Sequence, residues 1–154
     1  MSTSDFKSPD PEFAQRVQAS FARQAAMTTI GASLRSVEPG RVVIELPFSA
    51  HITQQHGFIH GGIMAAALDS ACGYAASSLM PADAGVLTIE FKVNLIAPAQ
   101  GRFFRMVGEV LKPGRTITVT EARAWAVDDD GSEKLVASMN ATMMVVTGRE
   151  GIRH

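Results

Sequence analysis

Asp69 is the only charged residue in a long run of alanines and apolar residues. The run reads HGFIHGGIMAAALDSACGYAASSL, from His56 to Leu79. Burying a charge without a partner is unfavourable, so this carboxylate needs either a distant structural partner or a chemical role. Desolvation would raise its pKa above the usual value of about 3.9, which improves a carboxylate as a base near neutral pH. Its neighbours on a helix cannot pair with it: Ala65, Ala66, Cys72 and Gly73.

Two consecutive glycines, Gly61 and Gly62, precede the aspartate and open a helix that must end before Pro81. The first N–H groups of a helix have no intrahelical partners and carry the positive end of its dipole. Glycine lets a ligand approach this backbone closely. The helix start could therefore hold a carbonyl oxygen that becomes an oxyanion, with Gln54 as a second donor. An oxyanion site and a carboxylate base suit acyl transfer to water.

The spacing of these two groups predicts a site shared between subunits. Eight residues along a helix span about 12 Å, which is too far for Gly61 and Asp69 of one chain to act on one carbonyl. Two antiparallel helices in a two-fold dimer would place the Asp69 of one chain near the Gly61 of the other. The sequence thus predicts two identical sites at an interface.

Local patterns predict the elements that position these residues. A helix over 10–27, capped by Asp10, should bury Phe13, Val17 and Phe21. A hairpin with its turn at residues 38–40 follows it, and then comes the long apolar helix. Four antiparallel strands complete the chain, with turns at Lys112-Pro113-Gly114 and Asp128-Asp129-Asp130-Gly131.

The first of these four strands, within residues 86–98, alternates between apolar and polar residues. One face should carry Leu87, Ile89, Phe91, Val93 and Leu95, and the other Thr88, Glu90, Lys92 and Asn94. Because the long helix is apolar nearly all round, the sheet must wrap it. The prediction is an α+β fold of about five to six antiparallel strands around a central helix, with an extra N-terminal helix. We expect a frayed segment 1–9, one domain over 10–147 and a tail over 148–154.

The composition narrows the class of partners. Lys and Arg number 14 and Asp and Glu 15 among 154 residues, a net charge of -1 that offers no general attraction to nucleic acid. Cys72 is the only cysteine, and the polar N-terminus lacks a secretory pattern, so we expect a cytoplasmic protein. Asp69 and several serines interrupt the apolar run over 63–80, so we expect no membrane span.

The stretch QQHGFIHGGIMAAALDSACGYAA resembles the hotdog-fold acyl-CoA thioesterases of the phenylacetate-degradation (PaaI-like) type, with their HGG…D pattern. The resemblance implies a hotdog fold and hydrolysis of an acyl-CoA to a free acid and coenzyme A. It implies no metal and no redox cofactor, since coenzyme A is part of the substrate. We also expect a homodimer, with a homotetramer formed as a dimer of dimers.

The same resemblance assigns roles to five residues. Gly61 N–H would polarise the thioester carbonyl, and His60 would shape the helix start. Asp69 from the partner subunit would be the general base or the nucleophile. Gln54 stands where members often have asparagine, and Thr88 where a hydroxyl can orient water.

Members of this family bind coenzyme A through basic side chains at the subunit surface. Lys112 and Arg115 flank the KPGR turn and are the candidates here, with Arg102 and Arg105 behind them. The alternative is that each is a solvated charge at a strand end.

Other interpretations stay open at the level of sequence. Asp69 could cap a second helical segment or be a buried structural acid. His51, His56 and His60 lack a metal-ligand pattern, and Cys72 is expected in the core. The chain could also be a non-catalytic acyl-CoA-binding or regulatory module, which would lose nothing on Asp69→Ala. A hotdog hydratase or dehydratase would pair a catalytic histidine with an acid.

Overall fold

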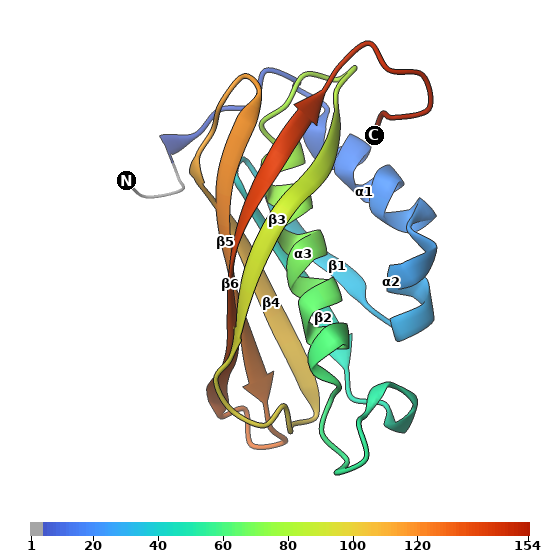
Figure 1. Cartoon of the computed structure of the whole chain (residues 1–154), viewed down its shortest axis with the longest axis vertical. Helices are drawn as coiled ribbons and strands as arrows, with labels where there is room; N and C mark the ends of the chain where they lie inside the picture. The colour runs from blue at the N-terminus through green and yellow to red at the C-terminus, as the bar shows by residue number, and fades with distance from the viewer. Residues whose placement is uncertain (1–4) are drawn as a thin grey trace.

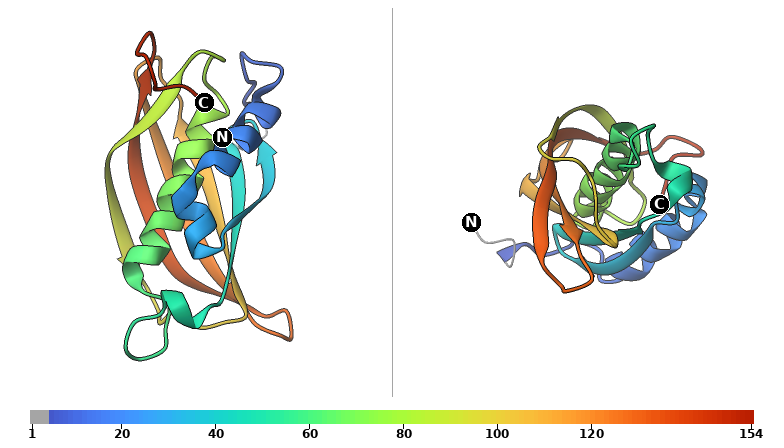
Figure 2. Two further views of the ribbon diagram at one scale, coloured as in Figure 1. Left: turned by 90° about the vertical axis from the view of Figure 1, so that its right-hand side faces the viewer. Right: turned by 90° about the horizontal axis from the view of Figure 1, so that it is seen from below.

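Six antiparallel strands form one sheet, in the order β1-β2-β4-β5-β6-β3, that wraps around the long helix α3 (Figures 1 and 2). The computed structural model describes residues 5–154. The elements are α1 (Phe13–Arg23), α2 (Ala25–Ile30), β1 (Ser33–Glu38), β2 (Arg41–Pro47), the 3-10 turn η2 (Ala50–Ile52), α3 (Gly61–Ser77), β3 (Gly85–Leu95), β4 (Phe103–Lys112), β5 (Ile117–Val127) and β6 (Glu133–Val146). The predicted α+β fold is confirmed.

Helix α3 is held close to the sheet by small residues. Ala67, Ala71 and Ala75 are fully buried, and α3 contacts β2, β3, β4, β5 and β6. At Gly108 of β4, a Cβ atom would lie only 2.4 Å from the carbonyl carbon and oxygen of Ala71. The sheet backbone therefore rests directly on the helix backbone, which fixes the depth of α3. Within residues 5–154, no helix is long and apolar enough to cross a bilayer.

We expect Gly108→Ala to lower the free energy of unfolding by about 1–3 kcal/mol, because the added methyl group forces helix and sheet backbones apart. Gly73→Ala is the matched control, since nothing lies within 4 Å of its added Cβ. That variant should gain up to about 1 kcal/mol from helix propensity. Urea unfolding of both variants measures the difference, and equal stabilities would show that α3 does not depend on this contact.

The N-terminal helix differs from the prediction of one continuous helix over 10–27. It breaks at Gln24, whose ψ is 94°, into α1 and α2. The stripe that buries Val17 and Phe21 would, if continued, carry Gln24 and Thr28 into the core. The break instead turns Met27 and Ile30 inward, where both are buried. The burial of apolar side chains thus outweighs helix continuity.

The predicted cap at Asp10 is also displaced, because the helix begins two residues later than expected, at Phe13. One carboxylate oxygen of Asp10 accepts the Glu12 N–H at 2.9 Å, and the other accepts Arg16 Nε at 2.8 Å. Asp10 therefore closes the turn before α1. The predicted frayed segment 1–9 begins in residues 1–4, outside the described residues, but Phe6 packs against the core.

The expected alternation along β3 is wrong at Leu87, because the strand contains a bulge between Thr88 and Glu90. Thr88 lies opposite Met143, and Phe91 opposite Ala141, and both of these β6 residues are buried under the helix. Residues directly opposite each other share a face. Thr88 and Phe91 therefore both face α3, whereas Leu87 faces outward. One extra residue moves each side chain that precedes it in β3 to the opposite face of the sheet.

Candidate active site

Asp69 lies in the middle of α3 and is partly buried, with a single hydrogen-bond partner among the described residues. Thr88 Oγ1 donates to Asp69 Oδ1 at 2.8 Å. Burial raises the pKa of the Asp69 carboxyl, and the hydrogen bond from Thr88 opposes that rise. The carboxylate makes no ion pair within residues 5–154. This is a desolvated acid with one oxygen atom free of protein donors.

The bulge in β3 is what aims Thr88 at this carboxylate. Under strict alternation Thr88 would lie on the face opposite to Phe91, away from the helix. Bulges often re-aim side chains beside functional sites. The hydroxyl thus reaches Asp69 because β3 carries one additional residue.

A cavity of about 100 Å³, here named the Asp69 cavity, opens beside this pair. It lies between α3, the start of β3 and the junction of α1 with α2. The residues that line it are Gln24, Asp69, Ser70, Gly73, Tyr74, Val86, Thr88 and His154. No local pattern in the sequence marks Gln24 or His154 as site residues, because only long-range packing brings them to Asp69.

The start of α3 is capped by His60. Its ring Nδ1 accepts the Gly62 N–H at 2.9 Å, and its backbone carbonyl accepts the N–H groups of Ile63 and Met64. The Gly61 N–H has no acceptor among residues 5–154. The helix dipole therefore presents one free donor at a position without a side chain.

A larger cavity of about 430 Å³, here named the Gly61 cavity, lies at this helix start. Gln54 lines it and accepts the His56 N–H through its side-chain oxygen. Both amide N–H donors of Gln54 have no acceptor in the described part of the chain, so they can bind a ligand oxygen. The lining residues are Gln54, Phe58, Ile59, Gly61, Met64, Leu95, Ile96, Ala97, Pro98, Ala99 and Val136.

The structure thus brings the predicted residues together as two separate groups. Asp69 and Thr88 share one cavity, and Gln54 and Gly61 share the other, with His60 between Gly61 and the loop. No described residue lines both cavities. A single chain keeps the free N–H donors of Gly61 and Gln54 apart from the Asp69 carboxylate.

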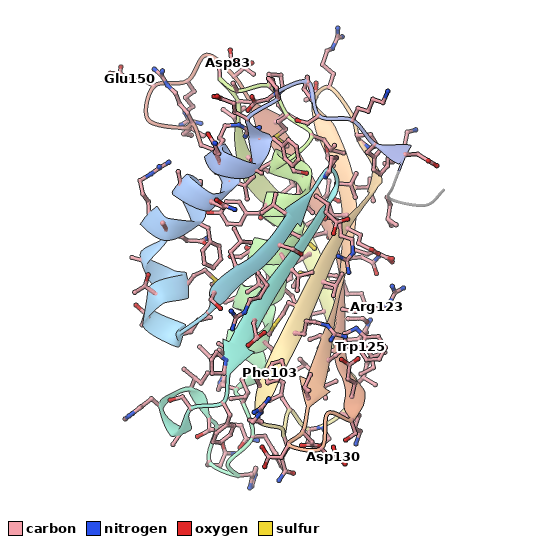
Figure 3. The ribbon with its side chains drawn as sticks, turned by 180° about the vertical axis from the view of Figure 1, so that it is seen from behind. Asp83, Phe103, Arg123, Trp125, Asp130 and Glu150 are labelled. Carbon is pink, nitrogen blue, oxygen red and sulfur yellow. The ribbon has the colours of Figure 1, made fainter. Side chains whose placement is uncertain are left out.

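The four basic candidates lie elsewhere. Lys112 and Arg115 are exposed at the β4–β5 turn and line neither cavity. Arg105 is paired with Glu133 on the outer face of the sheet, where Figure 3 shows Arg123 and Trp125 projecting away from α3. Arg102 lies over the Phe103 ring, 5.3 Å from its centroid.

Cys72 is buried in the core, as expected. Burial is the main cause that raises the pKa of its thiol to about 12. A thiol that stays protonated at neutral pH is a poor nucleophile. Among the described residues, Asp69 therefore remains the better candidate for chemistry in the centre of α3.

Comparisons with known proteins identify the family of this chain. The model of the Thioesterase superfamily matches residues 56–133. A solved thioesterase family protein from Silicibacter pomeroyi is 53% identical, with a TM-score of 0.86 over 88% of this chain and 99% of that one. The 1,4-dihydroxy-2-naphthoyl-CoA hydrolase of Listeria monocytogenes is 27% identical over 79% of this chain and 96% of its own.

The PaaI protein of the E. coli phenylacetic acid degradation operon shares the fold, with a TM-score of 0.75 at 20% identity over 87% of this chain and 93% of that one. The hotdog fold expected from the sequence is therefore confirmed. The matched region holds both glycines, Asp69 and Thr88. The chain belongs to the thioesterase superfamily.

Proposed function

We propose that this protein hydrolyses an acyl-CoA thioester to a free acid and coenzyme A. The observation that carries the proposal is a desolvated Asp69, without a countercharge among the described residues, on the same helix as a free Gly61 N–H. The name of the Listeria relative, a hydrolase of a CoA ester, supports the same substrate class.

In the proposed reaction, the Gly61 N–H and the Gln54 amide donate to the thioester carbonyl oxygen. Asp69 of the other subunit takes a proton from a water molecule, which adds to the carbonyl carbon. The C–S bond then breaks, and the coenzyme A thiolate leaves. Thr88 occupies only Oδ1 of Asp69, so Oδ2 is free to receive the proton.

The free edge of the sheet supports a dimer that completes this site. Strand β3 is an edge strand that exposes Leu87, Ile89 and Phe91. Exposed apolar edges invite pairing with another chain, and two-fold pairing of β3 with its copy would set the two α3 helices antiparallel. Asp69 of each subunit would then face Gly61 of the other.

The same symmetry gives Lys112 and Arg115 a role toward the phosphates of coenzyme A. Their turn lies at the C-terminal end of α3, since Val110 donates to Gly40 and Gly40 donates to Ser78. In an antiparallel pair, that end of one helix lies beside the start of the other. The turn would thus approach the Gly61 cavity of the partner. Neither residue forms an ion pair within residues 5–154.

Release of free thiol from a panel of alkyl and aryl acyl-CoAs tests the proposal, followed by a pH profile on the best substrate. On the acidic side of the profile, kcat/KM should fall as Asp69 becomes protonated. Because burial raises the pKa of Asp69, this fall should occur at a higher pH than for an ordinary aspartate. Thr88→Val should move this acidic limb to higher pH, because the lost hydrogen bond holds the pKa of Asp69 down.

Thr88→Ser is the matched control, since it retains the hydroxyl and should keep the wild-type profile. No hydrolysis of any acyl-CoA by the wild type would disprove the proposed activity. An acidic limb that stays in place in Thr88→Val would show that Asp69 is not the titrating base.

A further inference from the structure

The ring of His154 is fixed by contacts to three elements. Its Nε2 accepts the Val86 N–H at 3.0 Å, and its Nδ1 lies 2.6 Å from Ser20 Oγ. Because a backbone N–H can only donate, Nε2 is unprotonated, and the proton of the neutral ring is on Nδ1, facing Ser20. The ring also packs edge-on against Tyr74, with centroids 5.8 Å apart. β3, α1 and α3 together hold the imidazole in place.

The backbone before His154 is seated equally closely. A Cβ atom on Gly85 would lie 2.6 Å from Ile152 Cγ2 and 2.9 Å from the Ile152 carbonyl oxygen. Glycine at the start of β3 thus lets segment 147–154 lie directly on the strand. The ribbon shows this segment turning back from the end of β6 toward α1 (Figures 1 and 2). The tail is therefore packed into the domain and forms part of the wall beside Asp69.

The location of the Asp69 cavity means that this wall bears on which acyl groups can bind. This inference rests on the proposed function. If the carbonyl lies between Asp69 and the Gly61 of the other subunit, coenzyme A extends toward the Gly61 cavity. The acyl group must then extend past Asp69 into the cavity whose lining includes His154. That cavity holds about 100 Å³, which is smaller than an engineered cavity of about 150 Å³ that binds benzene.

We propose that His154 is a specificity-determining residue that limits the length of the acyl group. Its imidazole forms part of the wall of the Asp69 cavity, so the wild-type protein selects short acyl groups. The hydrogen bonds with Ser20 and Val86 orient the ring, and its edge-on packing against Tyr74 keeps it in the wall. Removal of the ring should extend the cavity toward α1 and admit longer chains.

Binding of S-alkyl coenzyme A thioethers, from ethyl to octyl, tests this by calorimetry without any need for hydrolysis. Each methylene that becomes buried should tighten Kd about fourfold. In the wild type this gain should stop at about butyl, when the cavity is full. In His154→Ala the gain should continue to hexyl or longer.

Two variants control for the size of the ring and for the tail. His154→Phe keeps a bulky ring without its hydrogen bonds and should retain the wild-type limit. Arg153→Ala changes an exposed neighbour that does not line the Asp69 cavity, and should also behave as wild type. The change in Kd per added methylene within one variant does not depend on the fraction of that variant that is folded. The calorimetric stoichiometry reports that fraction.

An unchanged limit in His154→Ala would overturn the inference, as would no dependence on chain length in any of the proteins. An equal extension in His154→Phe and His154→Ala would overturn it too, because the bulk of the ring would then be irrelevant. These results are distinct from failure of the proposed reaction. A wild type that shows the length limit but releases no thiol from any acyl-CoA would disprove hydrolysis alone.

Discussion

Replacement of Asp69 by asparagine should lower kcat by about two orders of magnitude or more, because the amide cannot accept a proton from water. The substitution is nearly isosteric and keeps an oxygen that can accept from Thr88. KM should change little, since in the proposed reaction the carboxylate acts on water rather than on coenzyme A. Steady-state release of thiol measures both quantities.

The same variant should unfold at the same or a higher temperature than the wild type. Burial raises the pKa of Asp69 in the folded protein, so the ionised form destabilises the fold. This loss of stability grows as pH rises from the unfolded pKa toward the folded pKa, and it is complete above the folded pKa. Asp69→Asn has no such pH-dependent loss, because the amide does not titrate in this range.

Asp83→Asn controls for the change in net charge, because Asp83 is exposed. It should leave both kcat and the unfolding temperature unchanged. A lower unfolding temperature in Asp69→Asn, with activity reduced only in proportion to the folded fraction, would make Asp69 a structural acid. High stability combined with lost turnover identifies a catalytic one.

Two inactive variants should regain activity when they are co-expressed. Asp69→Asn removes the proposed base, and Gly61→Val blocks the approach to the proposed oxyanion donor, so each homodimer should be inactive. In a hybrid dimer, one site combines the intact Asp69 of one subunit with the intact Gly61 of the other. With random pairing, half of the dimers are hybrids, so activity should return to about a quarter of the wild type.

A double variant that carries both substitutions in one chain is the matched control. Its hybrid with Asp69→Asn contains no intact site and should stay inactive. Failure of the single variants to complement each other would show that both groups act within one subunit. Different affinity tags on the two chains allow the hybrid to be purified and its activity assayed directly.

Much of the fold follows from local patterns in the sequence. The turn at Gly40, the span of α3 and both later turns depend on glycine, proline and short-range periodicity, and the structure confirms them. The face assignment along β3 failed at Leu87 and Thr88, because the alternation of apolar and polar residues does not reveal the bulge that follows them. The break at Gln24 was missed because it depends on where Met27 and Ile30 can be buried.

In the candidate site too, some residues can be recognised in the sequence, whereas some contacts depend on long-range packing. Asp69 and Gly61 stand out because a charge and paired glycines are unusual in an apolar helix. The contact of Thr88 with Asp69 depends on the β3 bulge, and the place of His154 depends on packing across 134 positions of sequence from Ser20. Neither is visible in spacing along the chain.

Both outer strands of the sheet are irregular, and this bears on aggregation. Strand β3 has its bulge, and the strand at the opposite edge, β1, is short and has its own irregularity between Leu34 and Ser36. Arg35 and Glu38 add charge to that edge. If β1 of one copy could pair with β3 of the next, the contact would repeat without closure and build a fibre. A short, charged and bulged β1 makes a poor template, so growth of the sheet should stop at a closed pair.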